Sequence, residues 1–180
     1  MRKPARVPGA RLAMALAVAA ALSACTVSAG PTYPPVGTTP QPAGAATDSA
    51  KAQLASALSV EGIQLTDPSA PYRPPEGAIF AAAPRTIVQA VLPDDPTGGY
   101  LVLYAFGTPQ QALAGAQDQA QYVASGPGKA QVMAGTQFEI RTLGNVAIFF
   151  AWRPDAALDA REASIPLALS TIGNEVPIPG

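Results

Sequence analysis

The second half of the chain contains four stretches whose apolar residues follow strand-like patterns. Residues 85–92 and 130–143 alternate between apolar and polar positions, whereas residues 100–106 and 146–152 are apolar on both faces. A strand with two apolar faces belongs in the middle of a sheet, and a strand with one polar face suits an edge. The pattern therefore predicts a four-stranded, mainly antiparallel sheet with residues 100–106 and 146–152 at its centre.

Apolar residues at helical spacing predict three helices, over residues 47–58, 109–125 and 164–172. Thr108 suits the N-cap of the second helix, and Pro109 suits its first position because that N–H has no partner within the helix. Together with the strands, these helices predict a single α+β domain. We expect the order β-β-α-β-β-α, with the helices on one face of the sheet.

Five aromatic side chains follow the two apolar strands. Alternation places Tyr100, Tyr104 and Phe106 on one side of their strand, and Phe150 and Trp152 on one side of theirs. If the two strands pair, these five residues could form one aromatic patch. The patch is then either a core beneath the helices or a groove for a partner on the open side of the sheet.

The beginning of the chain has the composition of a signal peptide. Basic residues precede an apolar run over residues 12–22, and small residues follow it. The run of 11 residues is shorter than the roughly 20 that span a bilayer. Leu22-Ser23-Ala24-Cys25 resembles the lipobox of bacterial lipoproteins. This resemblance implies cleavage after residue 24 and lipidation of Cys25; the alternative is an ordinary signal peptide with an incidental cysteine.

If Cys25 is lipidated, the bilayer is the partner of this end of the chain, at the extracytoplasmic face of a bacterial membrane. Residues 25–47 are rich in proline and contain no charged side chain, which predicts an extended, disordered tether. Residues 31–34 fit a PxxP recognition motif, with a plain spacer as the alternative. The sequence thus divides into a signal peptide at 1–24, the tether at 25–47 and an α+β domain at 48–180.

Composition excludes several kinds of chemistry. Removal of the signal peptide takes away four basic residues, so seven basic and 12 acidic residues remain, a formal charge of −5. Such a chain offers no basic patch for nucleic acid or for anionic lipid. The sequence has no histidine, and its one cysteine is Cys25. We therefore expect no metal, no cofactor and no disulfide within the chain.

No catalytic motif is present, and the polar residues that could carry chemistry also have plain structural interpretations. Asp94 and Asp95 could bind a cation, or could be solvated in a turn. Glu139 and Arg141 are expected to form a surface ion pair, and Lys129 lies in a Gly-Pro-Gly turn. Enzymatic activity would require at least two of these five residues to meet in a pocket.

The order strand-strand-helix-strand-strand-helix, over about 90 residues that end at Gly173, resembles a group of uncharacterised lipoproteins of bacterial envelopes. The match includes the two apolar strands, the alanine-rich helix and the closing Leu169-Ser170-Thr171-Ile172-Gly173. It implies no activity. The sequence therefore predicts a non-enzymatic envelope lipoprotein that binds a protein or small-molecule partner or has a structural role. The alternatives are a hydrolase-like enzyme and a homodimerising scaffold.

Overall fold

The computed structural model describes residues 44–180. The predicted signal peptide, Cys25 and nearly all of the predicted tether lie outside the described residues. No helix within residues 44–180 is long and apolar enough to cross a membrane.

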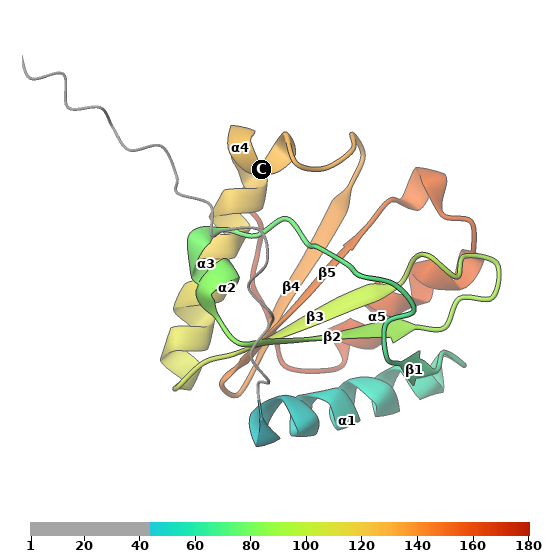
Figure 1. The fold of residues 1–180 in the computed structure, drawn as a ribbon, viewed down its shortest axis with the longest axis horizontal. Coiled ribbons are helices and arrows are strands. Elements are labelled where there is room, and N and C mark those ends of the chain that lie inside the picture. Colours follow the sequence, from blue (N-terminus) through green and yellow to red (C-terminus); the bar gives the residue numbers. More distant parts are fainter. Residues whose placement is uncertain (1–43) are drawn as a thin grey trace, which may run out of the picture. The chain divides into compact units, whose positions relative to one another are not determined.

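The described chain is an α+β unit built on one antiparallel sheet (Figure 1). Its strands lie in the spatial order β1-β2-β3-β5-β4-β6. Their bounds are Leu65–Thr66 (β1), Arg85–Ala90 (β2), Tyr100–Ala105 (β3), Gln137–Leu143 (β4), Val146–Trp152 (β5) and Asn174–Glu175 (β6). The helices are α1 (Ala45–Val60), α2 (Ala78–Ala82), α3 (Pro109–Ala124), α4 (Gly126–Lys129) and α5 (Ser164–Ser170), with 3₁₀ turns η1 (Pro154–Ala156) and η2 (Ala160–Ala163).

The four expected strands are the four central ones, and β3 pairs with β5 in the middle as their two apolar faces predicted. The expected count of four is nevertheless wrong for the described chain, because the sheet has six strands. The two-residue strands β1 and β6 pair with β2 and β4 and cover part of their outer edges. Short strands of this kind block pairing with another chain at a sheet edge.

Helices cover both faces of the sheet, which corrects the expectation of helices on one face. On one face α1 and α5 pack with Leu54, Leu58 and Leu169 against Leu101, Leu103 and Phe150. On the other face α2 and α3 pack with Phe80, Ala116 and Val123 against Val102, Tyr104 and Phe149. The reason is that β3 and β5 are apolar on both sides, so a single helical layer would leave one apolar face exposed to water.

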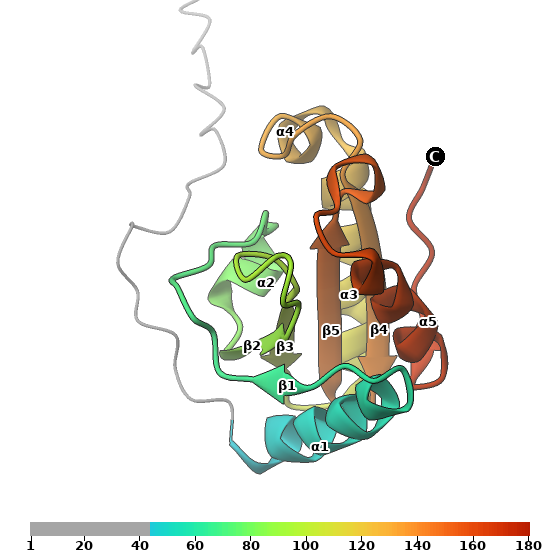
Figure 2. The ribbon, with the colours of Figure 1, turned by 90° about the vertical axis from the view of Figure 1, so that its right-hand side faces the viewer.

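Figure 2 shows the second view of this arrangement, with α1 and α5 beside each other at one side of the sheet. Both faces of the sheet are therefore covered in the described unit.

Local signals set the ends of α3 as expected. The Thr108 hydroxyl accepts a hydrogen bond from the Gln111 backbone N–H, and Pro109 occupies the first turn. The expected strand over residues 130–143 is wrong in its first half. Ser125 caps the short helix α4, turns follow, and β4 begins only at Gln137.

The first helix also begins earlier than expected, at Ala45 rather than residue 47, so the end of the predicted tether is helical. Gly44 precedes it, and Thr47 is buried inside its first turn, where its hydroxyl donates to the Gly44 carbonyl.

Candidate functional site

The five aromatic residues do not form one patch. Directly opposite residues of an antiparallel pair point to the same face, and Phe150 lies opposite Leu101. Phe150 and Trp152 therefore lie on the α1–α5 face, whereas Tyr104 and Phe106 lie on the α2–α3 face. Pairing of the strands was foreseen, but a register offset of one residue separates the two aromatic groups.

Most of these aromatic side chains belong to the core. Tyr104 and Phe150 are fully buried, and Tyr104 stacks on Phe80 of α2, with ring centroids 4.0 Å apart. Tyr100 and Trp152 differ because each also lines a cavity. Two of the five aromatic residues, Tyr100 and Trp152, therefore line a cavity that a ligand could enter.

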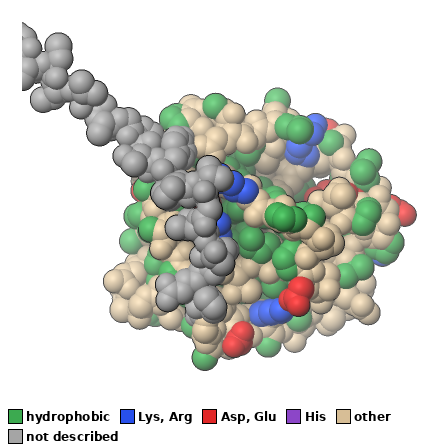
Figure 3. Space-filling model, in the orientation of Figure 1, with side chains coloured by type: hydrophobic (Ala, Val, Ile, Leu, Met, Phe, Trp, Pro, Cys, Tyr) green, Lys and Arg blue, Asp and Glu red, His purple; other side chains and the backbone are tan. Residues whose placement is uncertain are grey.

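The cavity has a volume of about 700 Å³ and lies where β3 begins and β5 ends. Four segments far apart in the sequence form its walls: residues 72–75, 95–100, 131–136 and 151–156, together with Glu162. Figure 3 shows this face hollowed, with acidic and basic side chains near the hollow. Its volume lies in the range of small-molecule sites, and its walls combine aromatic rings with charged and other polar side chains.

Aromatic rings form part of the cavity wall. Tyr72, from the proline-rich segment before α2, stacks on Tyr100 with ring centroids 4.5 Å apart and planes 2° from parallel. Burial, with a contribution from Glu76, raises the pKa of Tyr72 to about 12, so its hydroxyl stays neutral at physiological pH. Trp152 stacks on Phe150 at 5.0 Å and also lines the cavity.

Glu162 is the buried acidic group of the cavity. Its residue is 6% exposed, and within the described chain no hydrogen bond or ion pair engages its carboxyl group. Burial raises its pKa, and the nearby carboxylates of Asp95 and Asp159 raise it further. A carboxyl group that has no partner within the described chain and lines a cavity is a functional candidate.

Asp159 fixes the two loops that carry these acids. Its carboxylate accepts hydrogen bonds from the backbone N–H groups of Asp94 and Arg161, and from the Arg161 guanidinium at 2.6 and 2.9 Å. These contacts join the turn after β2 to the segment that leads into η2. The Arg161 hydrogen bonds lower the pKa of Asp159 from 3.8 to about 2.

We expect Asp159→Asn to flatten the pH dependence of stability between about pH 4 and pH 2. The folded-state pKa lies below the unfolded value, so the carboxylate stabilises the fold above pH 4, and this contribution is lost as the pH falls towards 2. Urea unfolding of both proteins across this range measures the slope. Equal slopes for the wild type and the variant would contradict the assignment.

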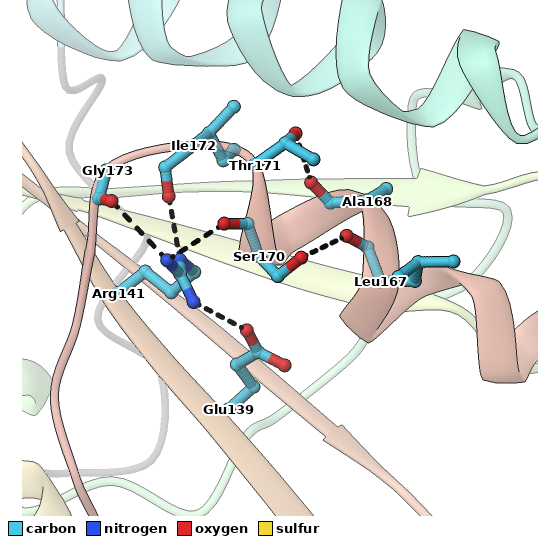
Figure 4. A network of polar contacts seen from close by, with 8 residues as sticks. All are labelled: Glu139, Arg141, Leu167, Ala168, Ser170, Thr171, Ile172 and Gly173. Atoms are coloured by element: carbon cyan, nitrogen blue, oxygen red, sulfur yellow. Dashed lines mark hydrogen bonds and ion pairs between the residues drawn. The ribbon is translucent and has the colours of Figure 1, made fainter.

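Glu139 and Arg141 form a buried pair, which corrects the expected surface pair (Figure 4). Their side chains are 15% and 7% exposed, and Arg141 Nη1 donates to Glu139 Oε1 at 3.1 Å. The other guanidinium donors reach backbone carbonyls after α5, at Ile172 (2.7 Å), Ser170 (3.3 Å) and Gly173 (3.4 Å). Burial raises the pKa of Glu139 against the opposing effect of Arg141.

Glu139 and Arg141 also line a second cavity of about 380 Å³. They are two of the five candidate residues, and they meet in a pocket and contact each other, as the enzymatic alternative requires. Asp94 and Lys129 are exposed, and Asp95 accepts hydrogen bonds from Thr97 of its own turn. Because the Arg141 donors are occupied by Glu139 and the helix end, this pair holds α5 against β4.

A second buried cluster was not foreseen. Glu76 accepts hydrogen bonds from Arg85 at 2.5 and 2.6 Å and from the Tyr104 hydroxyl at 2.7 Å. Burial of the Tyr104 hydroxyl raises the pKa of Tyr104, and the neighbouring Glu76 carboxylate raises it further. The cluster ties the proline-rich loop to β2 and β3. In the described part of the chain, no group of three or more Asp, Glu, His or Cys residues could hold a metal ion.

Sequence reasoning named Asp95, Tyr100 and Trp152 among its candidates, but it did not identify the cavity or Glu162. No periodic pattern could have done so, because the four wall segments are loops and strand ends that only the fold brings together. Comparison with known proteins adds no assignment: no protein-family model matches the chain, and neither a curated protein nor a solved structure matches it significantly.

Proposed function

We propose that this protein is a lipid-anchored lipoprotein of the bacterial cell envelope whose extracytoplasmic domain binds a small ligand in the cavity where β3 begins and β5 ends. The anchor is supported by the signal-peptide composition and by Leu22-Ser23-Ala24-Cys25. Replacing Cys25 tests this part, with membrane fractionation as the measurement. Acyl chains contribute about 0.8 kcal/mol for each buried CH₂ group, so stable anchoring requires more than one chain.

The observation that carries the binding role is the cavity of about 700 Å³ with an unpartnered buried carboxyl group and aromatic walls. The other buried acids contact partners that complete them: Glu76 has Arg85 and Tyr104, Glu139 has Arg141, and Asp159 has Arg161.

Trp152 offers a direct readout, because it is the single tryptophan of the chain and lines the cavity. We expect the dialysable small-molecule fraction of the cell envelope to change the Trp152 emission of the detergent-purified protein. The variant Ala156→Phe should weaken this response, since Ala156 is an exposed residue of the cavity wall and a phenyl ring there would occupy the space.

Ala114→Phe is the matched control, because Ala114 is an exposed residue of α3 that does not line the cavity. Its response should equal that of the wild type. If the emission does not change, or if Ala156→Phe responds as fully as the control, the cavity is not the binding site.

A further inference from the structure

We propose that the cavity selects small ligands that carry an ammonium group, with the carboxyl groups of Glu162 and Asp95 as the countercharge. This inference rests on the proposed ligand-binding function and names the chemical class that the same cavity would take.

Glu162 supplies the first argument. It is buried, it faces the cavity, and its carboxyl group forms no hydrogen bond or ion pair within the described chain. The charges that act on it are those of Asp95 and Asp159, both acidic. Arg161 does not neutralise it, because Asp159 engages that guanidinium. A cationic group that enters the cavity would provide the missing partner.

Asp95 supplies the second carboxyl group. Its Oδ1 atom accepts hydrogen bonds from the Thr97 backbone N–H and hydroxyl, at 3.2 and 3.0 Å. Its Oδ2 atom has no hydrogen bond in the described chain and lies over Gly98, where an added Cβ would come within 2.4 Å of it. Gly98 therefore leaves room for the carboxylate to stand at the cavity wall.

The aromatic wall favours the same ligand class. The faces of tyrosine and tryptophan rings attract organic cations through the negative face of the ring quadrupole. Tyr72, Tyr100 and Trp152 all line the cavity that contains the two acids. Acidic groups beside aromatic rings are the usual arrangement for recognising amines, and no group of metal ligands competes in the described chain.

Two arginines also line the cavity, and they define the competing expectation of an anionic ligand. Arg73 is exposed, so solvent screens its charge. Arg153 is half-buried, and its Nη1 atom contacts Met133 Sδ at 2.8 Å. Glu162 is thus the least exposed charged residue of the cavity wall, and we expect it to decide the selectivity.

Three probes of similar shape test this selectivity: phenethylamine, 3-phenylpropanoate and 2-phenylethanol. Each is titrated into the detergent-purified full-length protein at neutral pH, with Trp152 emission as the readout. We expect phenethylamine to bind at least about tenfold more tightly than the other two, the effect of one charge-assisted contact. Tighter binding of 3-phenylpropanoate would overturn the proposal and assign the cavity to anions.

The isosteric variant Glu162→Gln tests the residue itself. It removes the negative charge and keeps the shape of the side chain, so the fold should persist, which an unchanged far-UV circular dichroism spectrum checks. Phenethylamine affinity should fall about tenfold or more, whereas Glu61→Gln, at an acidic residue outside the cavity, should leave it unchanged.

The outcomes separate the two levels of the argument. If phenethylamine binds equally well to Glu162→Gln, the ammonium proposal is wrong although the cavity still binds ligands. If no probe changes the emission and the envelope fraction also has no effect, the proposed binding function itself fails. Equal losses in Glu162→Gln and Glu61→Gln would show that binding follows net charge or the detergent, which overturns the assignment to the cavity.

Discussion

Arg141→Ala is expected to lower the free energy of unfolding by about 3–5 kcal/mol, the usual cost of removing one partner of a buried ion pair. The substitution leaves the Glu139 carboxylate, which is 15% exposed, without its cation. It also removes the donors for the carbonyls of Ser170, Ile172 and Gly173, which end the last helix. Unsatisfied carbonyls at a helix C-terminus carry partial negative charge, so a guanidinium there stabilises the helix end.

Urea unfolding measures this loss of stability, and two further variants serve as comparisons for its size. Arg141→Lys keeps the charge but lacks the planar fork of donors, so its free energy of unfolding should lie between those of the wild type and Arg141→Ala. Lys51→Ala removes an ion pair whose partners are 38% and 88% exposed, and it should cost less than about 1 kcal/mol. If Arg141→Ala is no more destabilising than Lys51→Ala, the guanidinium does not hold the helix end as proposed.

Cys25→Ser is expected to move the protein from the membrane fraction to the soluble fraction. The proposed mature chain carries a formal charge of −5 and no polybasic segment, so it has no electrostatic attraction to anionic lipid. The described residues also contain no helix that could cross a bilayer. Under the proposal, retention at the membrane therefore depends on the acyl chains at Cys25.

The double variant Cys25→Ser, Ser28→Cys is the control for this experiment. It restores a thiol three residues further on, away from the small residues Ser23 and Ala24. We expect it to stay soluble, because the lipobox resemblance places the modified cysteine directly after that pair. Membrane retention of Cys25→Ser would contradict the anchor, and rescue by the double variant would show that any nearby cysteine suffices.

The central strands and the ends of α3 could be predicted because their signals are local. Two strands with apolar residues on both faces had to be central, and Thr108 with Pro109 had to begin a helix. The number of strands could not be predicted in this way. The strands β1 and β6 have two residues each, and they exist only because β2 and β4 offer hydrogen-bonding edges beside them.

The aromatic prediction failed for a related reason. Alternation gives the side of a strand on which residues lie together, but it does not relate the sides of two strands. That relation is the register, and here Leu101 opposite Phe150 places Tyr104 and Phe150 on opposite faces of the sheet.

The sequence by itself determined the four central strands, the acidic charge of the domain, and the lipobox-like residues on which the proposed anchor rests. Only the tertiary structure decided which charged groups are buried and what they meet. Arg141 meets carbonyls about 30 residues further along the chain, and Glu162 faces the same cavity as Asp95, in a different loop. Such contacts depend on how the elements pack, because side chains in distant loops carry no shared periodicity from which their proximity could be read.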